Sequence, residues 1–222
     1  IQNQPIIVGG TLYGVGLTKI YALNAATGAV KWEHTFRPLA GRNPRGTTYW
    51  TDGKERRLLI AYGGVVLALN ADTGAVITSF GKNGEVDLND QLRGTPAQNQ
   101  VRMTSPVVLH KNVFVTGGGV AERTPASPGD IRGWDVITGK LLWTFHTIPH
   151  PGEVGADTWP KDAYLTQGGA NAWNGSSVDT ARGIVFVNTG SPADDFVGIY
   201  RLGDNRGANS TIALDAKTGK RI

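Results

Sequence analysis

Short stretches of apolar residues recur along the chain, and each is followed by a polar turn. Residues 20–23, 65–69 and 211–214 are the plainest, because they alternate or run continuously in Ile, Val, Leu, Tyr and Ala. Runs of about four to eight such residues favour half-buried or buried β-strands. Long amphipathic patterns with the helical period are hard to find. The pattern therefore predicts an all-β fold built from many short strands.

The turn after these runs has a repeated sequence, Ala-x-Asp/Asn-x-x-Thr-Gly-x-x-x-Trp, which we call the turn cassette. Its Asp or Asn position is occupied in four copies by Asn24, Asn70, Asp135 and Asp215. An Asp or Asn side chain accepts hydrogen bonds from backbone amides two or more residues further on, and the glycine four residues later supplies a positive φ. Each copy therefore predicts a tight hairpin.

The tryptophan that ends a cassette offers a flat aromatic surface for docking onto a neighbouring repeat. Trp32 and Trp143 occupy this position, whereas the second copy has Thr78 there and the third has Gly133 in place of its alanine. In the fourth copy the tryptophan would fall one residue beyond Ile222. Because an isolated hairpin is only marginally stable, we expect the copies to stack on one another.

The spacing of the cassettes indicates the architecture. Successive Asn or Asp positions are 46, 65 and 80 residues apart, which fits the four-stranded blades of a β-propeller with growing loop insertions. An immunoglobulin-like sandwich would explain the strands but not the repeat. The predicted blades comprise residues 1–36, 57–81, 103–145 and 170–222. Residues 82–100 are polar, and we expect them to form a loop with a helical turn.

Composition supports a globular β protein. With 222 residues, 40% of them apolar, the chain can bury a sizeable core, and 31 glycines and 11 prolines suit many turns. The net charge of +4 is carried by scattered Lys and Arg residues, so nucleic acid is not an expected partner. No apolar run approaches the roughly 20 residues of a membrane helix. The absence of cysteine excludes disulfides and thiolate metal sites.

The two ends suggest a partial chain. Ile1 begins in what reads as the middle of a strand, and no initiator Met or signal-like segment precedes it. We therefore expect residues 1–222 to form a single propeller domain that is truncated at both ends.

Three loops open in the same way, because a strand ends in glycine and polar residues follow. They are residues 116–122, 168–173 and 188–192. Glycine lets a backbone approach a ligand closely. If these strand ends converge, a carboxylate, amides, hydroxyls and an indole would meet, which is a composition suited to a hard cation beside a flat aromatic ligand. Taken alone, Glu122 would be better explained as a solvated loop carboxylate.

The cassettes and several segments together resemble the quinoproteins, the eight-bladed pyrroloquinoline-quinone (PQQ)-dependent glucose and alcohol dehydrogenases. The resemblance covers essentially the whole chain, as about four blades. Its most specific segments are Arg-Gly-Thr-Thr-Tyr-Trp at 45–50, Thr-Ser-Pro at 104–106, Asp-Thr-Trp-Pro at 157–160, Gly-Gly-Ala-Asn-Ala-Trp at 168–173 and Gly-Ser-Pro-Ala at 190–193.

The resemblance implies a set of cofactor contacts. Arg45 matches an arginine that pairs with a PQQ carboxylate, Thr104 matches a threonine that hydrogen-bonds the cofactor, and Trp173 matches a tryptophan that lies under the PQQ ring. Three further cofactor-binding positions in the same loops are Gly119, Ala121 and Ala170. From the residues alone, Arg45 would also fit a surface ion pair, Thr104 a strand threonine and Trp173 an inter-blade docking residue.

The resemblance also implies a calcium site, with Glu122 and Ser191 as the metal positions. A carboxylate is a suitable hard ligand. The alcohol dehydrogenases of the family have asparagine at the position of Ser191, and a hydroxyl is a weaker ligand than an amide oxygen. Asn188, Asp194 or Asp195 could compensate.

Other candidate residues carry less weight. The cysteine pair that methanol dehydrogenases place beside the cofactor would fall near Leu39 and Ala40, which favours the glucose-type branch. His110, His146 and His150 have no partner at a metal-ligand spacing, so we interpret them as structural or solvated.

The reaction implied by the resemblance is the oxidation of a sugar or alcohol hydroxyl, with calcium polarising the quinone and hydride passing to PQQ. The family's catalytic aspartate would lie beyond Ile222, so we expect the fragment alone to be inactive. The implied electron acceptor is a cytochrome or ubiquinone, and the implied location is the periplasm.

Two alternatives from other functional classes remain. One is a non-catalytic propeller of the same repeat type that acts as a binding scaffold, which would have no need of Arg45, Glu122 and Trp173 together. The other is a calcium-binding propeller that recognises carbohydrate, which would need the loops but not Arg45.

Overall fold

The structure is a computed structural model that describes residues 3–36, 44–94, 100–103 and 105–222. Its regular structure is almost entirely β, which confirms the predicted fold class. The helical elements of the described residues are three single turns, η1 (Ala156–Thr158), α1 (Ala163–Thr166) and η2 (Gly198–Tyr200). None of the helices in these ranges is long and apolar enough to cross a membrane.

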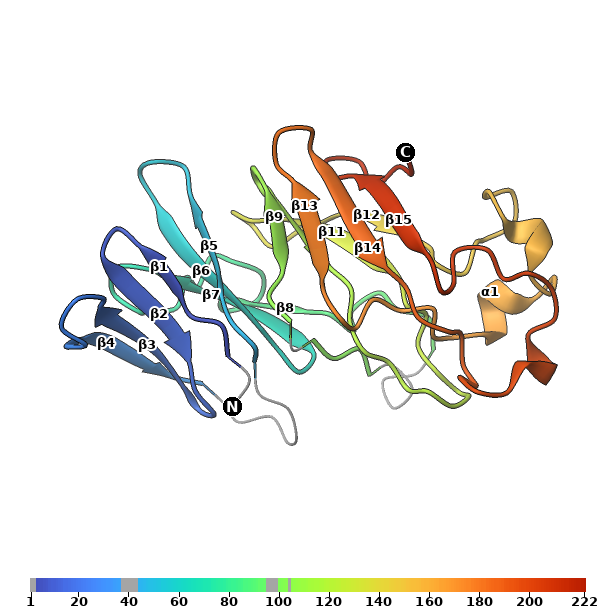
Figure 1. The fold of residues 1–222 in the computed structure, drawn as a ribbon, viewed down its shortest axis with the longest axis horizontal. Helices are drawn as coiled ribbons and strands as arrows, with labels where there is room; N and C mark the ends of the chain where they lie inside the picture. The colour runs from blue at the N-terminus through green and yellow to red at the C-terminus, as the bar shows by residue number, and fades with distance from the viewer. Residues whose placement is uncertain (1–2, 37–43, 95–99, 104) are drawn as a thin grey trace. The chain divides into compact units, whose positions relative to one another are not determined.

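The strands form four antiparallel sheets, and in each sheet neighbours in sequence are neighbours in space (Figure 1). Three sheets have four strands, as predicted for propeller blades, and the fourth contains β13 to β15, with an isolated bridge from Leu214 of β15 to Arg221. The strands are β1 (Ile6–Val8), β2 (Thr11–Val15), β3 (Lys19–Asn24), β4 (Val30–Thr35), β5 (Thr48–Thr51), β6 (Arg56–Tyr62), β7 (Val65–Asn70), β8 (Glu85–Asp87), β9 (Val108–His110), β10 (Val113–Thr116), β11 (Ile131–Asp135), β12 (Leu141–Phe145), β13 (Ser176–Asp179), β14 (Ile184–Asn188) and β15 (Thr211–Asp215).

The chain divides into two compact units. The first comprises Ile1–Asp87, Met103–Val107 and Ile137–Gly139, and the second comprises Leu88–Arg102, Val108–Val136 and Lys140–Ile222. The first unit holds the sheets β1–β4 and β5–β8, and the second holds β9–β12 and β13–β15. That the 222 residues form a single domain stays a prediction.

In the first unit the two sheets share one apolar core. Tyr13 and Val15 of β2 are buried with Leu58 and Ile60 of β6. Leu12 and Gly14, which alternate with them along β2, are partly exposed. The ring of Tyr13 also stacks on Tyr49 of β5 at a centroid distance of 6.3 Å. Alternate residues of β2 and β6 thus face this core, and β6 is also buried on its other face, at Leu59 and Ala61.

The second unit repeats this arrangement. Val115 of β10 and Ile131 of β11 pack with Val185 and Val187 of β14 and with Leu214 of β15. The last three are completely buried. Burying such side chains stabilises the unit by about 1.5–3 kcal/mol each relative to leaving them in water.

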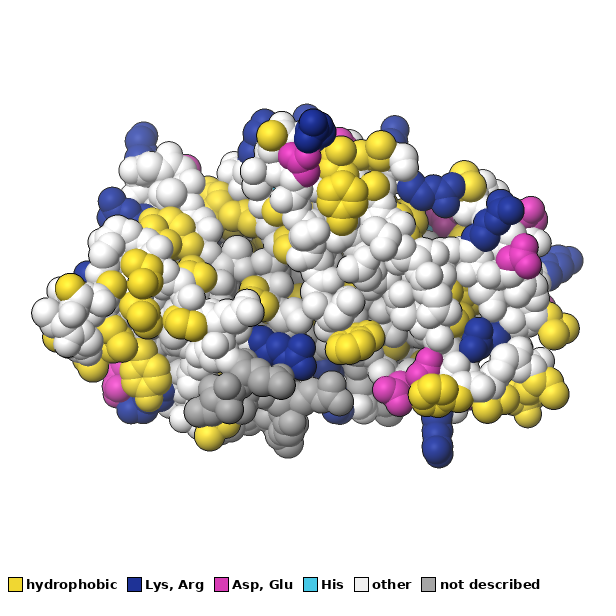
Figure 2. All heavy atoms as spheres, viewed as in Figure 1, with side chains coloured by type: hydrophobic (Ala, Val, Ile, Leu, Met, Phe, Trp, Pro, Cys, Tyr) yellow, Lys and Arg dark blue, Asp and Glu magenta, His cyan; other side chains and the backbone are white. Residues whose placement is uncertain are grey.

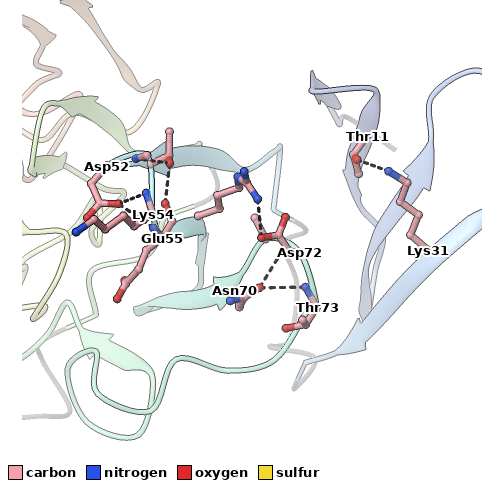
Figure 3. A network of polar contacts seen from close by, with 12 residues as sticks. Thr11, Lys31, Asp52, Lys54, Glu55, Asn70, Asp72 and Thr73 are labelled. Carbon is pink, nitrogen blue, oxygen red and sulfur yellow. Dashed lines mark hydrogen bonds and ion pairs between the residues drawn. The ribbon is translucent and has the colours of Figure 1, made fainter.

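The cassettes form the turns that their sequence predicts. In the second copy, the Asn70 side chain accepts hydrogen bonds from the backbone N–H groups of Asp72 at 2.9 Å and Thr73 at 3.1 Å (Figure 3). The glycines of the four copies have φ between 69° and 74°, the left-handed region that glycine adopts without strain. The predicted tight turn is confirmed at each cassette, and in the first and third copies it joins the two strands of a hairpin, β3–β4 and β11–β12.

The cassette tryptophan docks on the turn of another cassette. Within the first unit, the Trp32 indole N–H donates to the carbonyl oxygen of Ala71 at 3.0 Å, and the ring lies against Gly74. A Cβ atom at Gly74 would lie 2.5 Å from Cε3 of the ring. The glycine therefore serves both the turn and the ring above it.

The same contact occurs within the second unit. The Trp143 indole N–H donates to the carbonyl oxygen of Ala216 at 3.1 Å. A Cβ atom at Gly219 would lie 2.5 Å from Cδ2 of this ring. These two contacts confirm that the aromatic end of one repeat docks on its neighbour.

The second cassette departs from the prediction beyond its turn. No strand directly follows Gly74; the chain forms only an isolated bridge from Val76 to Leu69. The fourth strand of this sheet is β8, within residues 82–100 that we expected to be a loop. That expectation was wrong because β8 has just three residues, Glu-Val-Asp, of which only Val86 is buried, too short to show a pattern.

The second cassette has no tryptophan to dock on the turn of the third cassette, and a buried arginine binds that turn instead. The side chain of Arg57 on β6 is 3% exposed, and its Nη1 donates to the carbonyl oxygen of Ile137 in the third cassette's turn at 2.8 Å. The Gly81 N–H donates to the carbonyl oxygen of Thr138 in the same turn at 2.9 Å. Both bonds lie within the first unit. A guanidinium and a backbone amide thus bind the turn that an indole would otherwise hold.

Candidate functional site

Three glycine-containing loops meet in the second unit. The Gly118 N–H donates to the carbonyl oxygen of Ala172 at 3.0 Å, and the Gly190 N–H donates to that of Asn171 at 3.0 Å. The loop that contains Asn171 and Ala172 therefore lies between the loop after β10 and the loop after β14. These strand ends form the framework of the candidate site.

Asn171 holds the three loops together. Its side-chain Nδ2 donates to the carbonyl oxygen of Gly118 at 2.7 Å, and its own carbonyl accepts from Gly190. Sequence reasoning did not single out this residue. The only signal in the sequence was its place inside the Gly-Gly-Ala-Asn-Ala-Trp segment. Its role could not be predicted, because hydrogen bonds between loops depend on which strands become neighbours.

The loops approach so closely that side chains are excluded at Gly117 and Gly169. A Cβ atom at Gly117 would lie 2.8 Å from both Cβ and the carbonyl oxygen of Ala172. Gly169 has a φ of 78°, and a Cβ there would lie 2.5 Å from the backbone nitrogen of Ala193. Glycine is therefore required here for close backbone packing.

Trp173 presents its indole to solvent beside these loops. The residue is 57% exposed, whereas the docking residue Trp143 is 8% exposed. A Cβ atom at Gly190 would lie 3.8 Å from the indole nitrogen, and one at Gly119 would lie 3.9 Å from Cβ of Trp173. With no side chains at these two glycines, a large part of the indole surface remains open.

The remaining predicted cofactor positions differ in exposure. Gly119 forms two backbone hydrogen bonds with Arg102, at 2.7 Å and 2.8 Å, so its backbone is fixed. Ala121 is exposed. Ala170 is completely buried, with φ 51°, and its N–H donates to the carbonyl oxygen of Ser191 at 2.8 Å. In this structure Ala170 shapes the loop and its methyl group does not reach the surface.

Arg45 belongs to the first unit. It is partly buried, and its carbonyl oxygen accepts a hydrogen bond from the backbone N–H of Gln4 at 2.9 Å. The next residue, Gly46, forms a parallel bridge with Gln4. The backbone on both sides of the guanidinium-bearing residue is therefore held by the N-terminal segment. Thr104 lies outside the described residues, so its predicted role stays a prediction.

The two predicted metal positions lie on neighbouring segments of the second unit. Glu122 is exposed, and its carbonyl oxygen accepts a hydrogen bond from the backbone N–H of Asp195 at 3.1 Å. The Ser191 hydroxyl donates to Oδ1 of Asn209 at 3.2 Å. Among the residues that the structure describes, no three His, Asp or Glu side chains are grouped so that they could hold a metal ion. Any cation here would depend on amide, hydroxyl or backbone oxygens beside one carboxylate.

The three residues proposed to compensate for Ser191 have other contacts. Oδ1 of Asn188 accepts from the Thr211 hydroxyl at 2.8 Å, and Oδ1 of Asp194 accepts from the Thr124 backbone N–H at 2.7 Å. Asp195 contacts Glu122 through its backbone. The oxygen beside the Ser191 hydroxyl instead belongs to Asn209, which sequence reasoning did not assign.

A separate cluster surrounds the two histidines of the 146–153 loop. The rings of His146 and His150 stack at a centroid distance of 3.7 Å. His146 Nδ1 lies 2.9 Å from Oε1 of Glu153, and the other carboxylate oxygen, Oε2, accepts from the His150 backbone N–H at 2.7 Å. The interpretation of these histidines as structural fits this closed set of contacts.

The two carboxylates near the histidines shift in opposite directions. Burial raises the pKa of Asp130 above its ordinary value, against the lowering effect of His146, Arg132 and His150. Burial also acts to raise the pKa of Glu153, but its hydrogen bonds from His146 and His150 outweigh this and lower the pKa. Burial dominates at Asp130, and hydrogen bonding to the charged form dominates at Glu153.

A protein-family model described as "Glucose/ethanol/alcohol dehydrogenase, beta-propeller domain", in the PQQ family, matches residues 1–222. The chain belongs to this family. PQQ is therefore the cofactor of its family, and the predicted resemblance is confirmed.

Curated relatives in the PQQ family include two bacterial enzymes. The quinoprotein glucose dehydrogenase of Escherichia coli (strain K12) is 30% identical over 244 residues, which cover 99% of this chain and 30% of the relative. The glycerol dehydrogenase large subunit of Gluconobacter oxydans (strain 621H) is 30% identical over 235 residues, covering 98% of this chain and 31% of the relative. The chain thus spans about a third of the length of these relatives.

Solved structures of the PQQ family share the fold. A quinohemoprotein alcohol dehydrogenase from Pseudomonas putida HK5 aligns with a TM-score of 0.80 and 26% identity, over 100% of this chain and 33% of that chain. The four antiparallel sheets with docked cassettes are therefore blades of a β-propeller.

The second unit suits the family's cofactor in two respects. The exposed indole of Trp173 can contact a flat ring system, because aromatic rings favour stacked partners. The backbone beside it is fixed by Asn171 and carries glycines, so a planar ligand would meet no side chains at Gly119 and Gly190. The residues present therefore fit PQQ.

Proposed function

We propose that these residues form part of a PQQ-dependent dehydrogenase that oxidises a hydroxyl group of a sugar or an alcohol. The observation that carries the proposal is the open indole of Trp173, 57% exposed among glycine-edged loops, in a chain whose full length matches the PQQ family. An exposed tryptophan beside fixed glycines has no evident role in packing the blades.

The chain's own residues would bind and orient the cofactor. Trp173 would lie under the ring system, and Gly119 would allow the backbone to approach it. Arg45 would pair with a cofactor carboxylate, a task suited to the two parallel N–H donors of a guanidinium. Glu122 would supply the carboxylate ligand of a calcium ion.

When bound, PQQ supplies the acceptor for the hydride removed from the substrate carbon. The group that takes the hydroxyl proton is proposed to be an aspartate outside the 222 residues. The proposed electron acceptor is a cytochrome or ubiquinone, and the proposed location is the periplasm. Relatives named as glucose and alcohol dehydrogenases support a sugar or alcohol as the substrate class.

A PQQ titration tests the proposal. The protein should be expressed with whatever sequence flanks residues 1–222 in its gene, and titrated with PQQ in the presence of calcium. Equilibrium dialysis would measure affinity, and dye-linked oxidation of glucose and simple alcohols would measure turnover. We expect Trp173→Ala and Arg45→Ala each to weaken PQQ binding by roughly 5- to 150-fold, because each removes a contact worth about 1–3 kcal/mol.

A buried tryptophan supplies the matched control. Trp143→Phe removes an indole that docks between repeats of the same unit, so it should lower stability and leave PQQ affinity unchanged. A folded parent protein that neither binds PQQ nor oxidises these substrates would contradict the proposal and favour a binding scaffold. Calcium binding without any response to PQQ would favour carbohydrate recognition.

A further inference from the structure

Two neutral oxygens lie side by side at the edge of the loop cluster. The hydroxyl of Ser191, in the loop after β14, donates to the side-chain Oδ1 of Asn209, which lies two residues before β15, at 3.2 Å. The residues are 18 positions apart in the sequence. Only the pairing of β14 with β15 brings them together.

The backbone on both sides of this pair is fixed. The Asn209 N–H donates to the carbonyl oxygen of Gly190 at 3.0 Å, and the Thr189 N–H donates to that of Ser210 at 2.9 Å. These two bonds continue the β14–β15 ladder past the ends of the strands. Asn209 itself has φ 48°, a left-handed conformation that asparagine adopts more readily than most residues. Its side chain is therefore held beside Ser191 by the local backbone.

We propose that Asn209 supplies the amide oxygen of the cation site and acts together with the Ser191 hydroxyl as a pair of neutral ligands. The inference rests on the proposed function, because the cation is the calcium of that site. The resemblance implies an amide ligand at position 191, where this chain has the weaker hydroxyl ligand of Ser191. Asn209 would supply the missing amide oxygen.

The separation of the two oxygens suits calcium. Calcium binds oxygen ligands at about 2.3–2.6 Å in flexible shells of six to eight. On a shell with a radius of about 2.4 Å, two oxygens about 3.2 Å apart subtend roughly 84°, close to the angle between adjacent ligands in such shells. The pair could therefore contact one cation with little movement.

The location also suits a cation beside the flat ligand. Ser191 follows Gly190, where a Cβ atom would lie 3.8 Å from the indole nitrogen of Trp173, and the Asn209 N–H donates to the carbonyl oxygen of the same glycine. The segment after Ser191 continues alongside Glu122, through the bond from Asp195 to the Glu122 carbonyl. A carboxylate, an amide and a hydroxyl are thus carried on adjoining segments.

The test is calcium binding without PQQ, measured by calorimetry on the protein with its native flanking sequence. Asn209→Gly removes the side chain, and glycine tolerates the positive φ, so the variant should keep its fold. We expect it to bind calcium roughly tenfold more weakly than the parent. Asn209→Asp, which keeps an oxygen and adds charge, should bind at least as tightly as the parent.

A second background makes the test specific. In Ser191→Asn the amide oxygen is restored at position 191, so adding Asn209→Gly should then change calcium affinity far less than it does in the parent. Asn83→Gly is the matched control, because this exposed asparagine also has a positive φ, 55°, and belongs to the first unit, outside the loops of the cation site. It should leave calcium affinity unchanged.

The outcomes separate this inference from the proposed function. If the parent binds calcium and PQQ but Asn209→Gly binds calcium equally well, the role of Asn209 is refuted and the dehydrogenase proposal stands. Equal losses from Asn209→Gly in both backgrounds would also refute the pairing with Ser191. If the parent binds PQQ but no calcium, only the cation site is refuted. If it binds neither, the proposed function fails as well.

Discussion

Gly133 of β11 lies directly against the indole of Trp143, its register partner on β12. A Cβ atom at position 133 would lie 2.5 Å from Cζ2 of that ring and closer still to Cε2 and Nε1. In the first cassette the corresponding register pair is Ala22 and Trp32, and there the alanine is completely buried. The glycine is thus an adaptation to the position of one ring and not a random departure from the repeat.

Restoring the repeat's alanine at this position should therefore destabilise the protein. We expect Gly133→Ala to lower the free energy of unfolding by about 1–3 kcal/mol, the usual cost of overpacking a filled core. Urea denaturation followed by tryptophan fluorescence would measure the change. Ala22→Gly is the reciprocal variant. It should lower the free energy of unfolding by only about 1 kcal/mol, because glycine increases the entropy of the unfolded chain and introduces no clash in the folded one. A Gly133→Ala protein as stable as its parent would show that Trp143 can move aside.

Arg57 should be irreplaceable by lysine. Its guanidinium donates to the Ile137 carbonyl and also to Oε2 of Glu55 through Nε at 3.1 Å and Nη2 at 2.6 Å. It lies over the ring of Trp50, 5.6 Å from the centroid. A lysine ammonium cannot reproduce this geometry. We expect Arg57→Lys to lower the free energy of unfolding by about 1–3 kcal/mol, because a buried acceptor loses its donor.

The neighbouring residue gives the control for Arg57. Arg56 forms an ion pair with Asp72 at 3.1 Å, and both side chains are about half exposed. Arg56→Lys should change stability by less than about 0.5 kcal/mol, as is usual for exposed pairs. Comparable losses from the two variants would argue against a special role for the Arg57 contact with the third cassette.

The carboxylate of Asp130 should make stability fall as the pH rises. Its pKa is raised in the folded state, so its contribution is fully present below the unfolded pKa of about 3.9 and is lost as the pH rises through the folded pKa. Asp130→Asn has no carboxylate to ionise at this position, so it does not lose this stability as the pH rises. Relative to the parent, the variant should gain stability between pH 3.5 and pH 7, as measured by urea denaturation at several pH values.

Glu153 provides a control of opposite sign. Its pKa is lowered in the folded state, so its contribution is present above the unfolded pKa of about 4.3 and is lost as the pH falls through the folded pKa. Glu153→Gln should be less stable than the parent at pH 7, and the two should converge in acid. If both variants show the same pH trend, burial does not dominate at Asp130.

The sequence by itself determined the local structure. Because Asx turns and left-handed glycines are set by residues within five positions, the turns at Asn24 and Asn70 formed as predicted. The repeated tryptophan also predicted docking between repeats. These features depend on short-range geometry, which a repeat displays several times over.

Only the tertiary structure decided the contacts made between distant segments. Arg57 in place of an indole, Asn171 as the tie between three loops and Asn209 beside Ser191 all depend on which strand ends become neighbours. Strand β8 was missed because its pairing with β7, and not its own three residues, makes it a strand. A hydrogen bond across many residues leaves no periodic trace in the sequence, so its partner appears only when the chain has folded.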